Sequence, residues 1–180
     1  MFAFFHALRL NLAQPALTAD SYFSWPNLLQ APGQLVRYTS FVEVMAPLFD
    51  RDTLRDCLSS FSESRSGWGL DWVWGHLCQQ SGKTMAIIDA TPVKHTRPVA
   101  SGGDLYKNNP ELDPKLDRER LVAKYGLAAT VELGAASGGT PLAKSAPIVA
   151  WAASVVTAIT GLGGSCPPLT DPSCTKVNGT

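Results

Sequence analysis

The sequence predicts an α/β fold in which helices and strands alternate irregularly along the chain. Apolar residues recur at helical spacing after Asp50, and a second helix is expected after Asp113-Pro114, which supply an N-cap and a proline at the first helical position. Between these helices, Lys83 to Asp89 has the continuous apolar character of a buried strand. With 180 residues and 45% hydrophobic side chains, the chain can bury a core.

The amino-terminal segment from Met1 to Leu12 is expected to form a short helix with one buried face. Four apolar residues recur there at near-helical spacing, namely Phe4, Phe5, Leu8 and Leu12. The segment is shorter than the ~20 apolar residues of a membrane span. It also lacks the basic start and the cleavage site of a signal peptide. The chain then becomes extended at Gln14-Pro15, because the residue before a proline resists helix.

The next elements are a strand, an extended segment and a helix. Leu35 to Thr39 is expected to be a strand after the Pro32-Gly33 turn. Phe41 to Phe49 is apolar apart from Glu43 and Pro47, and we expect an extended segment that ends at the proline. Asp50 is placed to cap a helix that ends in the polar residues 62–67. Its apolar face would comprise Leu54, Cys57, Leu58 and Phe61.

Aromatic residues are densest just after this helix. Trp68, Trp72 and Leu77 could share one face of a helix that starts near Asp71. The strand over Lys83–Asp89 follows, and prolines at both ends keep Pro92 to Val99 extended. The helix after Asp113-Pro114 would bury three apolar side chains and be capped by Gly126; these side chains are Leu121, Val122 and Tyr125.

Charge is distributed unevenly along the chain. The sequence holds 15 basic and 15 acidic residues, a balance that excludes a typical nucleic-acid-binding protein. Most of these charges lie between Arg37 and Glu132. The tail over 134–180 is rich in Ala, Gly, Ser and Pro, and we expect it to be loosely structured, with one helix at most. A membrane helix over 146–164 is not favoured, because Ala, Val and Gly dominate there; a cytoplasmic protein, with membrane association left open, is expected.

The four cysteines form no metal-binding motif. No Cys-x-x-Cys pair occurs, so neither a zinc ribbon nor a thioredoxin-like site is indicated. Cys57 lies on the apolar face of a helix and is expected to be a small core residue. Cys166 and Cys174 could pair in an oxidising compartment, although reduced thiols are the default expectation.

Several polar side chains are candidates for a functional site. Asp71 follows a tryptophan, Trp68, that is flanked by glycines and could stack on a sugar; Asp71 could act as a general base or could simply cap its helix. Glu43 lies in an apolar run, where it could line a site or face solvent on an alternating strand. Asp50-Arg51-Asp52 spells an Asp-x-Asp metal motif, but capping explains both carboxylates.

A second group of candidates follows the strand over Lys83–Asp89. His95 leaves the carboxyl end of that strand, where ligands of open α/β sheets collect, and is a candidate metal ligand. Arg97 would project to the same side and could bind phosphate. Asp89 could contribute to this site or could be a turn residue at the end of the strand.

Together these stretches resemble domain-of-unknown-function family 707, whose members are regarded as glycosyltransferases with a GT-A-like, Rossmann-like fold. The resemblance covers roughly Leu12 to Tyr125. The matching stretches, in order, are Gln14-Pro15-Ala16-Leu17, Phe41-Val42-Glu43-Val44-Met45-Ala46-Pro47-Leu48-Phe49, Gly67-Trp68-Gly69-Leu70-Asp71, and Ile87-Ile88-Asp89 with His95 downstream.

The resemblance implies transfer of a sugar from a nucleotide-sugar donor to a hydroxyl acceptor such as a glycan. Asp71 would be the catalytic base, His95 a ligand of Mn²⁺ or Mg²⁺, and Glu43 and Trp68 would line the acceptor region. Arg97 is a substrate-binding candidate from its position and charge alone. The metal-binding Asp-x-Asp and the nucleotide-binding half should precede Gln14, so residues 1–133 are expected to be the carboxyl-terminal part of such a domain, inactive alone. A non-catalytic carbohydrate-binding or partner-docking module that uses the tryptophans is the alternative.

Overall fold

The computed structural model describes residues 1–99, 104–127 and 140–141. Its elements confirm the mixed α/β class. The sheet has five strands in the order β3-β1-β4-β2-β5. In chain order the strands are β1 (Leu12–Leu17), β2 (Gln34–Tyr38), β3 (Leu48–Phe49), β4 (Met85–Val93) and β5 (Thr140–Pro141). The helices are α1 (Phe2–Ala7), α2 (Arg51–Cys57), α3 (Leu70–Gln80), α4 (Asp104–Asn108) and α5 (Pro114–Tyr125), with short 3₁₀ turns η1 (Pro26–Leu28) and η2 (Leu58–Glu63).

The centre of the sheet is the parallel pair β1 and β4, and the other pairings are antiparallel. Every residue of β1 is buried, as expected for a strand covered on both faces. Pro15 cannot donate a ladder hydrogen bond, and the register between β1 and β4 shifts between Pro15 and Leu17. The expected strands over 35–39 and 83–89 are confirmed, although β4 continues four residues further, to Val93.

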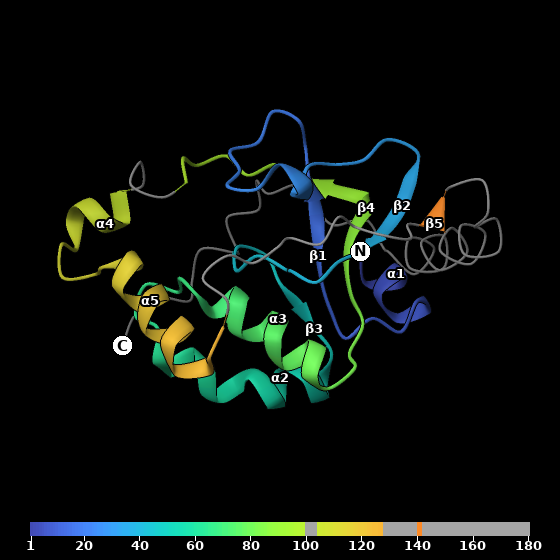
Figure 1. The fold of residues 1–180 in the computed structure, drawn as a ribbon. Helices are drawn as coiled ribbons and strands as arrows, with labels where there is room; N and C mark the ends of the chain where they lie inside the picture. Colours follow the sequence, from blue (N-terminus) through green and yellow to red (C-terminus); the bar gives the residue numbers. More distant parts are fainter. Residues whose placement is uncertain (100–103, 128–139, 142–180) are drawn as a thin grey trace, which may run out of the picture. The chain divides into compact units, whose positions relative to one another are not determined.

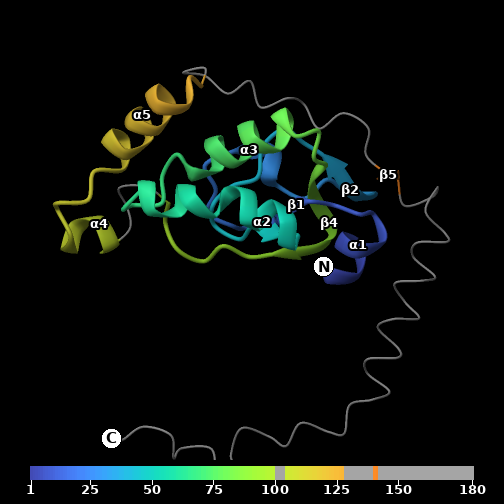
Figure 2. The same ribbon diagram turned by 90° about the horizontal axis from the view of Figure 1, so that it is seen from below.

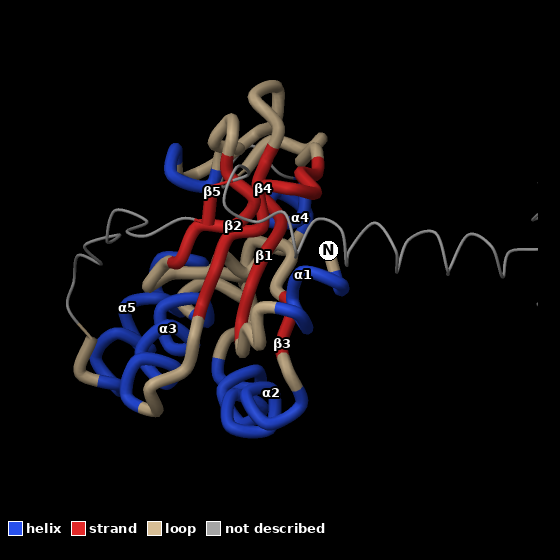
Figure 3. Tube along the Cα trace, turned by 90° about the vertical axis from the view of Figure 1, so that its right-hand side faces the viewer, coloured by secondary structure: helices blue, strands red, loops and turns tan. Residues whose placement is uncertain are grey.

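Side chains of β1 and β4 alternate between the two faces of the sheet and pack against different helices on each face. Leu12 and Met85 pack with residues of α2, α3 and α5 in one core cluster. Their neighbours Ala13 and Ala86 point the opposite way and pack against Phe5 of α1. Helices α2, α3 and α5 therefore cover one face and α1 covers the other (Figures 1 and 3).

The amino-terminal helix is shorter than expected. It ends at Ala7, and Arg9 adopts a positive φ of 50°. The prediction that Leu12 belongs to this helix is wrong, because Leu12 pairs with Phe49 of β3 and Met85 of β4 at the start of β1. Phe5 is the residue that α1 buries, while Phe2 stays exposed.

The segment over 41–49 is also different from the prediction. Residues 41–47 form a loop with a turn. The extended segment is expected to end at Pro47, whereas β3 begins just after this proline. The backbone N–H of Glu43 donates to Gln14 Oε1 at 2.5 Å, so this loop is bonded to a β1 side chain and not to a neighbouring strand. Phe41 and Val42 anchor the loop in the core, with 1% and 0% of their surfaces exposed.

Helix α2 begins where the sequence predicts but buries a different stripe. Asp50 is its N-cap and accepts from the Thr53 N–H at 2.7 Å, so Asp50-Arg51-Asp52 is a helix start. Apart from Cys57, the predicted apolar face is wrong: Leu54, Leu58 and Phe61 are exposed. The buried residues are Thr53 and Cys57 of α2 and Ser60 of η2. The Ser60 hydroxyl accepts from the Trp74 indole N–H at 3.0 Å and donates to the Cys57 carbonyl at 2.6 Å.

The remaining helix predictions are confirmed with small shifts. Helix α3 begins at Leu70 after an N-cap at Gly69, so Trp68 precedes the helix. Asp113 caps α5 by accepting from the N–H groups of residues 115 and 116, and Gly126 ends it in the left-handed conformation. The start of α3 lies against α5 (Figure 2). Leu121 is fully buried, whereas Val122 and Tyr125 are partly exposed.

Cys57 and Cys78 are buried free thiols in the same core cluster, which confirms the core role expected for Cys57. The chain divides into a unit over Met1–Ala146 and a second over Pro147–Thr180. The second unit, with the predicted helix at 146–164, Cys166 and Cys174, lies outside the described residues, as does most of the predicted tail. Within the described ranges, the helices are all too short or too polar to cross a membrane.

Candidate functional site

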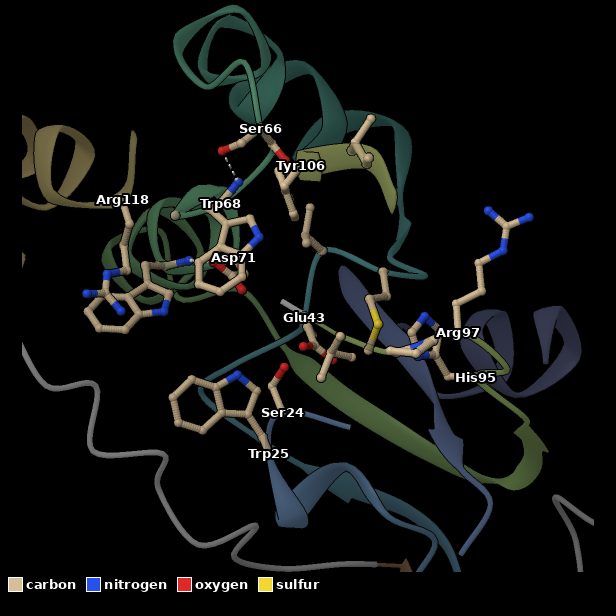
Figure 4. A pocket seen from close by; sticks show the side chains of 17 residues that line it. Ser24, Trp25, Glu43, Ser66, Trp68, Asp71, His95, Arg97, Tyr106 and Arg118 are labelled. Carbon is tan, nitrogen blue, oxygen red and sulfur yellow. Dashed lines mark hydrogen bonds between the residues drawn. The ribbon is translucent and has the colours of Figure 1, made fainter. Parts of the chain in front are cut away.

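A cavity of about 670 Å³ opens at the carboxyl ends of β1 and β4. Five of the candidate residues line it, although they come from three separate segments: Glu43, Trp68, Asp71, His95 and Arg97. In Figure 4, Asp71 and Glu43 lie in the middle, with His95 and Arg97 on one side and Arg118 on the other. This is the edge of an open α/β sheet where ligands commonly bind.

The two carboxyl groups in the cavity are both buried. Glu43 is 6% exposed and Asp71 is 8% exposed, so neither is a surface residue of an alternating strand. Glu43 Oε2 has no hydrogen-bond partner among the described residues. Asp71 lies one residue inside α3, whose N-cap is Gly69, and its Oδ1 accepts from the Trp72 N–H at 3.0 Å. The capping interpretation of Asp71 is therefore wrong, and its carboxylate is available to the cavity.

Burial changes the acidity of both groups. Desolvation and, to a smaller extent, the Asp71 charge raise the pKa of Glu43 to about 7, against the lowering effect of the Ser24 hydroxyl. Desolvation likewise raises the pKa of Asp71 to about 6, against the lowering effects of the Trp72 N–H and the Arg118 charge. Near neutral pH, Glu43 is therefore protonated to a larger extent than Asp71 in the same cavity.

Three tryptophans supply most of the aromatic surface of the cavity. Trp25 follows β1 and packs edge-on against Phe41, with ring centroids 5.9 Å apart. Trp68 precedes α3 and is half-buried, whereas Trp72 is 9% exposed within α3. An indole ring beside polar groups is a common platform for the apolar face of a sugar.

The loop that carries Trp68 is held by Asp117, which the sequence analysis missed. Asp117 Oδ2 accepts from the N–H groups of Arg65 and Ser66, at 3.0 and 2.9 Å, and from the Ser66 hydroxyl at 2.8 Å. Ser66 Oγ in turn accepts from the Trp68 N–H at 3.3 Å. Asp117 thus fixes the loop from α5, 51 positions away, and no local pattern indicates that pairing.

His95 and Arg97 lie on the strand-end side of the cavity. The backbone N–H of His95 donates to Ser21 Oγ at 3.1 Å. The ring is positioned by His95 Nδ1, which lies 3.1 Å from the Tyr22 carbonyl oxygen. In the described part of the chain, no three side chains of His, Cys, Asp or Glu are grouped to hold a metal ion. The role of His95 as a ligand of Mn²⁺ or Mg²⁺ stays a prediction.

Asp89 does not belong to the cavity, and the turn-residue interpretation is wrong as well. Its side chain is fully buried in the middle of β4. Arg37 of β2 binds it with two hydrogen bonds, Nε to Oδ2 at 2.9 Å and Nη2 to Oδ1 at 3.0 Å. Arg37 also donates to the carbonyls of Asn27 and Leu29, at 2.8 and 2.7 Å, which ties the segment after Trp25 to the sheet.

The structure adds Arg118 and Tyr106 to the cavity wall. Arg118 of α5 places its Cζ 5.7 Å from the centre of the Trp72 ring. The Tyr106 hydroxyl of α4 donates to the Ser66 carbonyl at 3.4 Å. A second hollow of about 460 Å³ lies on the other side of Trp72 and Arg118, which line both. No sequence pattern indicates that Arg118, on the surface of a helix, and Tyr106, in a polar segment, line this cavity.

In comparisons with known proteins, no family model, no curated protein and no solved structure matches the chain. The resemblance to family 707, the GT-A-like assignment and the roles of the five predicted residues therefore stay predictions.

Proposed function

We propose that the cavity is the acceptor site of a glycosyl-transfer reaction on a partial GT-A-like, Rossmann-like domain. The acceptor would be a sugar hydroxyl, and the donor a nucleotide-sugar. The observation that carries the proposal is the pairing of two buried carboxyl groups, Glu43 and Asp71, in a cavity walled by tryptophans. Carboxyl groups that titrate near neutral pH are suited to acid–base chemistry, and flat indoles are suited to sugar rings.

Asp71 would act as the base. With a pKa of about 6, it is mostly ionised at pH 7 and can accept the acceptor hydroxyl proton as the oxygen attacks the anomeric carbon of the donor. A bond forms between that oxygen and that carbon, the bond from the carbon to the donor phosphate oxygen breaks, and the nucleoside diphosphate leaves with the bonding electrons. The proton ends on Asp71.

Glu43 would orient the acceptor. Its pKa of about 7 leaves a large protonated fraction at neutral pH, and a protonated carboxyl can donate a hydrogen bond to a sugar oxygen while its other oxygen accepts one. Two acids in one cavity thus take different roles because their environments differ.

Two variants test the proposal. The chain is screened for binding to a panel of oligosaccharides. Because the chain is expected to be inactive alone, transfer from a mixture of UDP- and GDP-sugars to the bound oligosaccharides is followed by mass spectrometry with a fusion in which the nucleotide-binding half of a GT-A enzyme precedes this chain. Asp71→Asn should leave binding within about twofold and reduce transfer by roughly 100-fold or more, the usual contribution of a general base. Trp68→Ala should lose binding. Transfer that survives Asp71→Asn would remove Asp71 from the chemistry.

A non-catalytic carbohydrate-binding module is the second candidate. The observation that favours it is the tryptophan set Trp25, Trp68 and Trp72, which needs no donor site to bind a sugar. In that case the fusion binds the oligosaccharide without transferring to it, and Asp71→Asn changes neither result.

Metal chelation by EDTA should leave sugar binding unchanged under either candidate, because the tryptophans that bind the sugar are side chains of the protein.

A further inference from the structure

Arg118 is a cation of the cavity wall that has no ion-pair partner within the described ranges. It is half-buried on α5, and no hydrogen bond from its guanidinium to another described residue is formed. Most of the other described lysines and arginines are paired with a carboxylate: Arg37, Arg55, Lys83, Lys94, Lys115, Arg120 and Lys124. A half-buried arginine without a carboxylate is therefore unusual in this chain.

The position of Arg118 suits it to bind an anion. Its guanidinium lies over the ring of Trp72, and Trp72 is itself fixed by burial within α3. Contact with an aromatic face leaves the N–H groups at the edge of the guanidinium free to donate. Those donors form a planar fork that matches a carboxylate, phosphate or sulfate with two parallel hydrogen bonds.

The charge of the cavity favours a negatively charged ligand. Its acids are Glu43 and Asp71, and its permanent cations are Arg97 and Arg118. The Arg118 charge lowers the pKa of Asp71, yet the two residues form no ion pair, so the guanidinium is not consumed by that carboxylate. While Glu43 is protonated, the two arginines outweigh the single Asp71 charge.

We propose that the sugar bound in this cavity carries an oxyanion and that Arg118 binds that group. The inference rests on the proposed function, because it assumes that the tryptophans hold a sugar ring. It narrows the ligand class to acidic sugars: a uronic acid, a sugar phosphate or a sugar sulfate. Arg118 would then be a specificity-determining residue, with Asp71 beside it facing the acceptor hydroxyl.

The test compares matched ligands by isothermal titration in EDTA. The probes are a glucuronate-terminated disaccharide, its carboxyl-reduced neutral counterpart, and the phosphorylated and sulfated forms of that neutral disaccharide. At least one acidic form should bind about tenfold more tightly than the neutral one, the effect of a paired charged hydrogen bond. The preferred form identifies the oxyanion. Arg118→Gln should abolish the preference, so that the variant binds the acidic and the neutral forms about equally, and Arg118→Lys should keep part of the preference.

Arg51→Gln is the matched control, since Arg51 is an exposed arginine of α2 with no ion pair to another described residue; it should retain the full preference. Equal binding of neutral and acidic sugars would overturn the inference and leave the proposed function standing. A preference that survives Arg118→Gln, with folding verified by circular dichroism, would also overturn it. Binding of none of the four sugars would overturn the proposed function together with the inference.

Discussion

The charge of Asp71 raises the pKa of Glu43 within one cavity. Both side chains are more than nine-tenths buried, so water screens their interaction weakly. Glu43 comes from the loop before β3 and Asp71 from the first turn of α3, and neither segment is close to the other in sequence. The fold thus holds two acids together at a cost in stability, which is typical of a functional site.

That cost predicts a pH-dependent stability. Glu43 titrates near 4.5 in the unfolded chain and near 7 in the folded one, so the folded state binds more protons between these values. The free energy of unfolding therefore falls as pH rises from about 4.5 to 7. Glu43→Gln removes this penalty, about 3 kcal/mol at pH 8 at roughly 1.4 kcal/mol per pKa unit. Urea unfolding of both proteins at pH 5 and pH 8 measures it.

The control for this measurement is Glu119→Gln, which changes an exposed acid of α5 and should leave the wild-type pH dependence intact. If Glu43→Gln follows the same pH profile as the wild-type chain, then Glu43 does not titrate as its burial requires.

The Arg37–Asp89 pair predicts a large loss of stability on substitution. Asp89→Ala leaves the Arg37 guanidinium, 13% exposed, without its counter-charge inside the protein. Removing one partner of a buried pair costs about 3 kcal/mol or more. Asp52→Ala breaks the exposed pair with Arg55 and should cost less than about 1 kcal/mol. Chemical denaturation compares the two, and similar losses would mean that the buried pair has no special weight.

This pair also shows where sequence reasoning stops. The helix starts at Asp50 and Asp113 could be predicted, because capping depends on residues two or three positions apart. Asp89 could not be assigned, because its partner Arg37 lies 52 positions away on an adjacent strand. Likewise, Ser60 of η2 is buried with a hydrogen bond from the Trp74 indole, which no periodicity of apolar residues reveals.

The candidate site was predictable in part. Trp68, Asp71 and His95 carry local signals, namely flanking glycines and a position after a strand. The cavity that joins them, and the raised pKa of Glu43, depend on tertiary burial. Arg118 and Asp117 had no local signal at all, because each acts on a segment that is more than 40 positions earlier in the chain.

Asp117→Asn is expected to loosen the loop that carries Trp68. The amide keeps one acceptor oxygen but loses the charge that receives three donors of residues 65 and 66. Hydrogen bonds to a charged group are worth about 1.5–3 kcal/mol, so a lower melting temperature and weaker sugar binding should appear together. Arg120→Gln removes an exposed partner of Asp117 together with its hydrogen bond to the Glu63 carbonyl at 2.6 Å, and it should weaken binding less than Asp117→Asn does. Unchanged binding in Asp117→Asn would separate the loop from the site.

Gly69→Ala tests the contact that positions Arg118 against the start of α3. Gly69 has a φ of +87°, which costs an L-residue about 1–2 kcal/mol, and an added Cβ would lie 3.0 Å from the Arg118 backbone Cα and 3.1 Å from Leu121. Helix α5 must therefore shift. Gly82 has a φ of +63° and open space around it, so Gly82→Ala has the backbone cost without the crowding. We expect Gly69→Ala to lower the free energy of unfolding by at least about 1 kcal/mol more than Gly82→Ala, because crowding adds to the backbone cost. Gly69→Ala should also reduce sugar binding, because Arg118 and Trp72 move apart. Equal effects of Gly69→Ala and Gly82→Ala would mean that the close approach of α5 to Gly69 does not position the residues of the site.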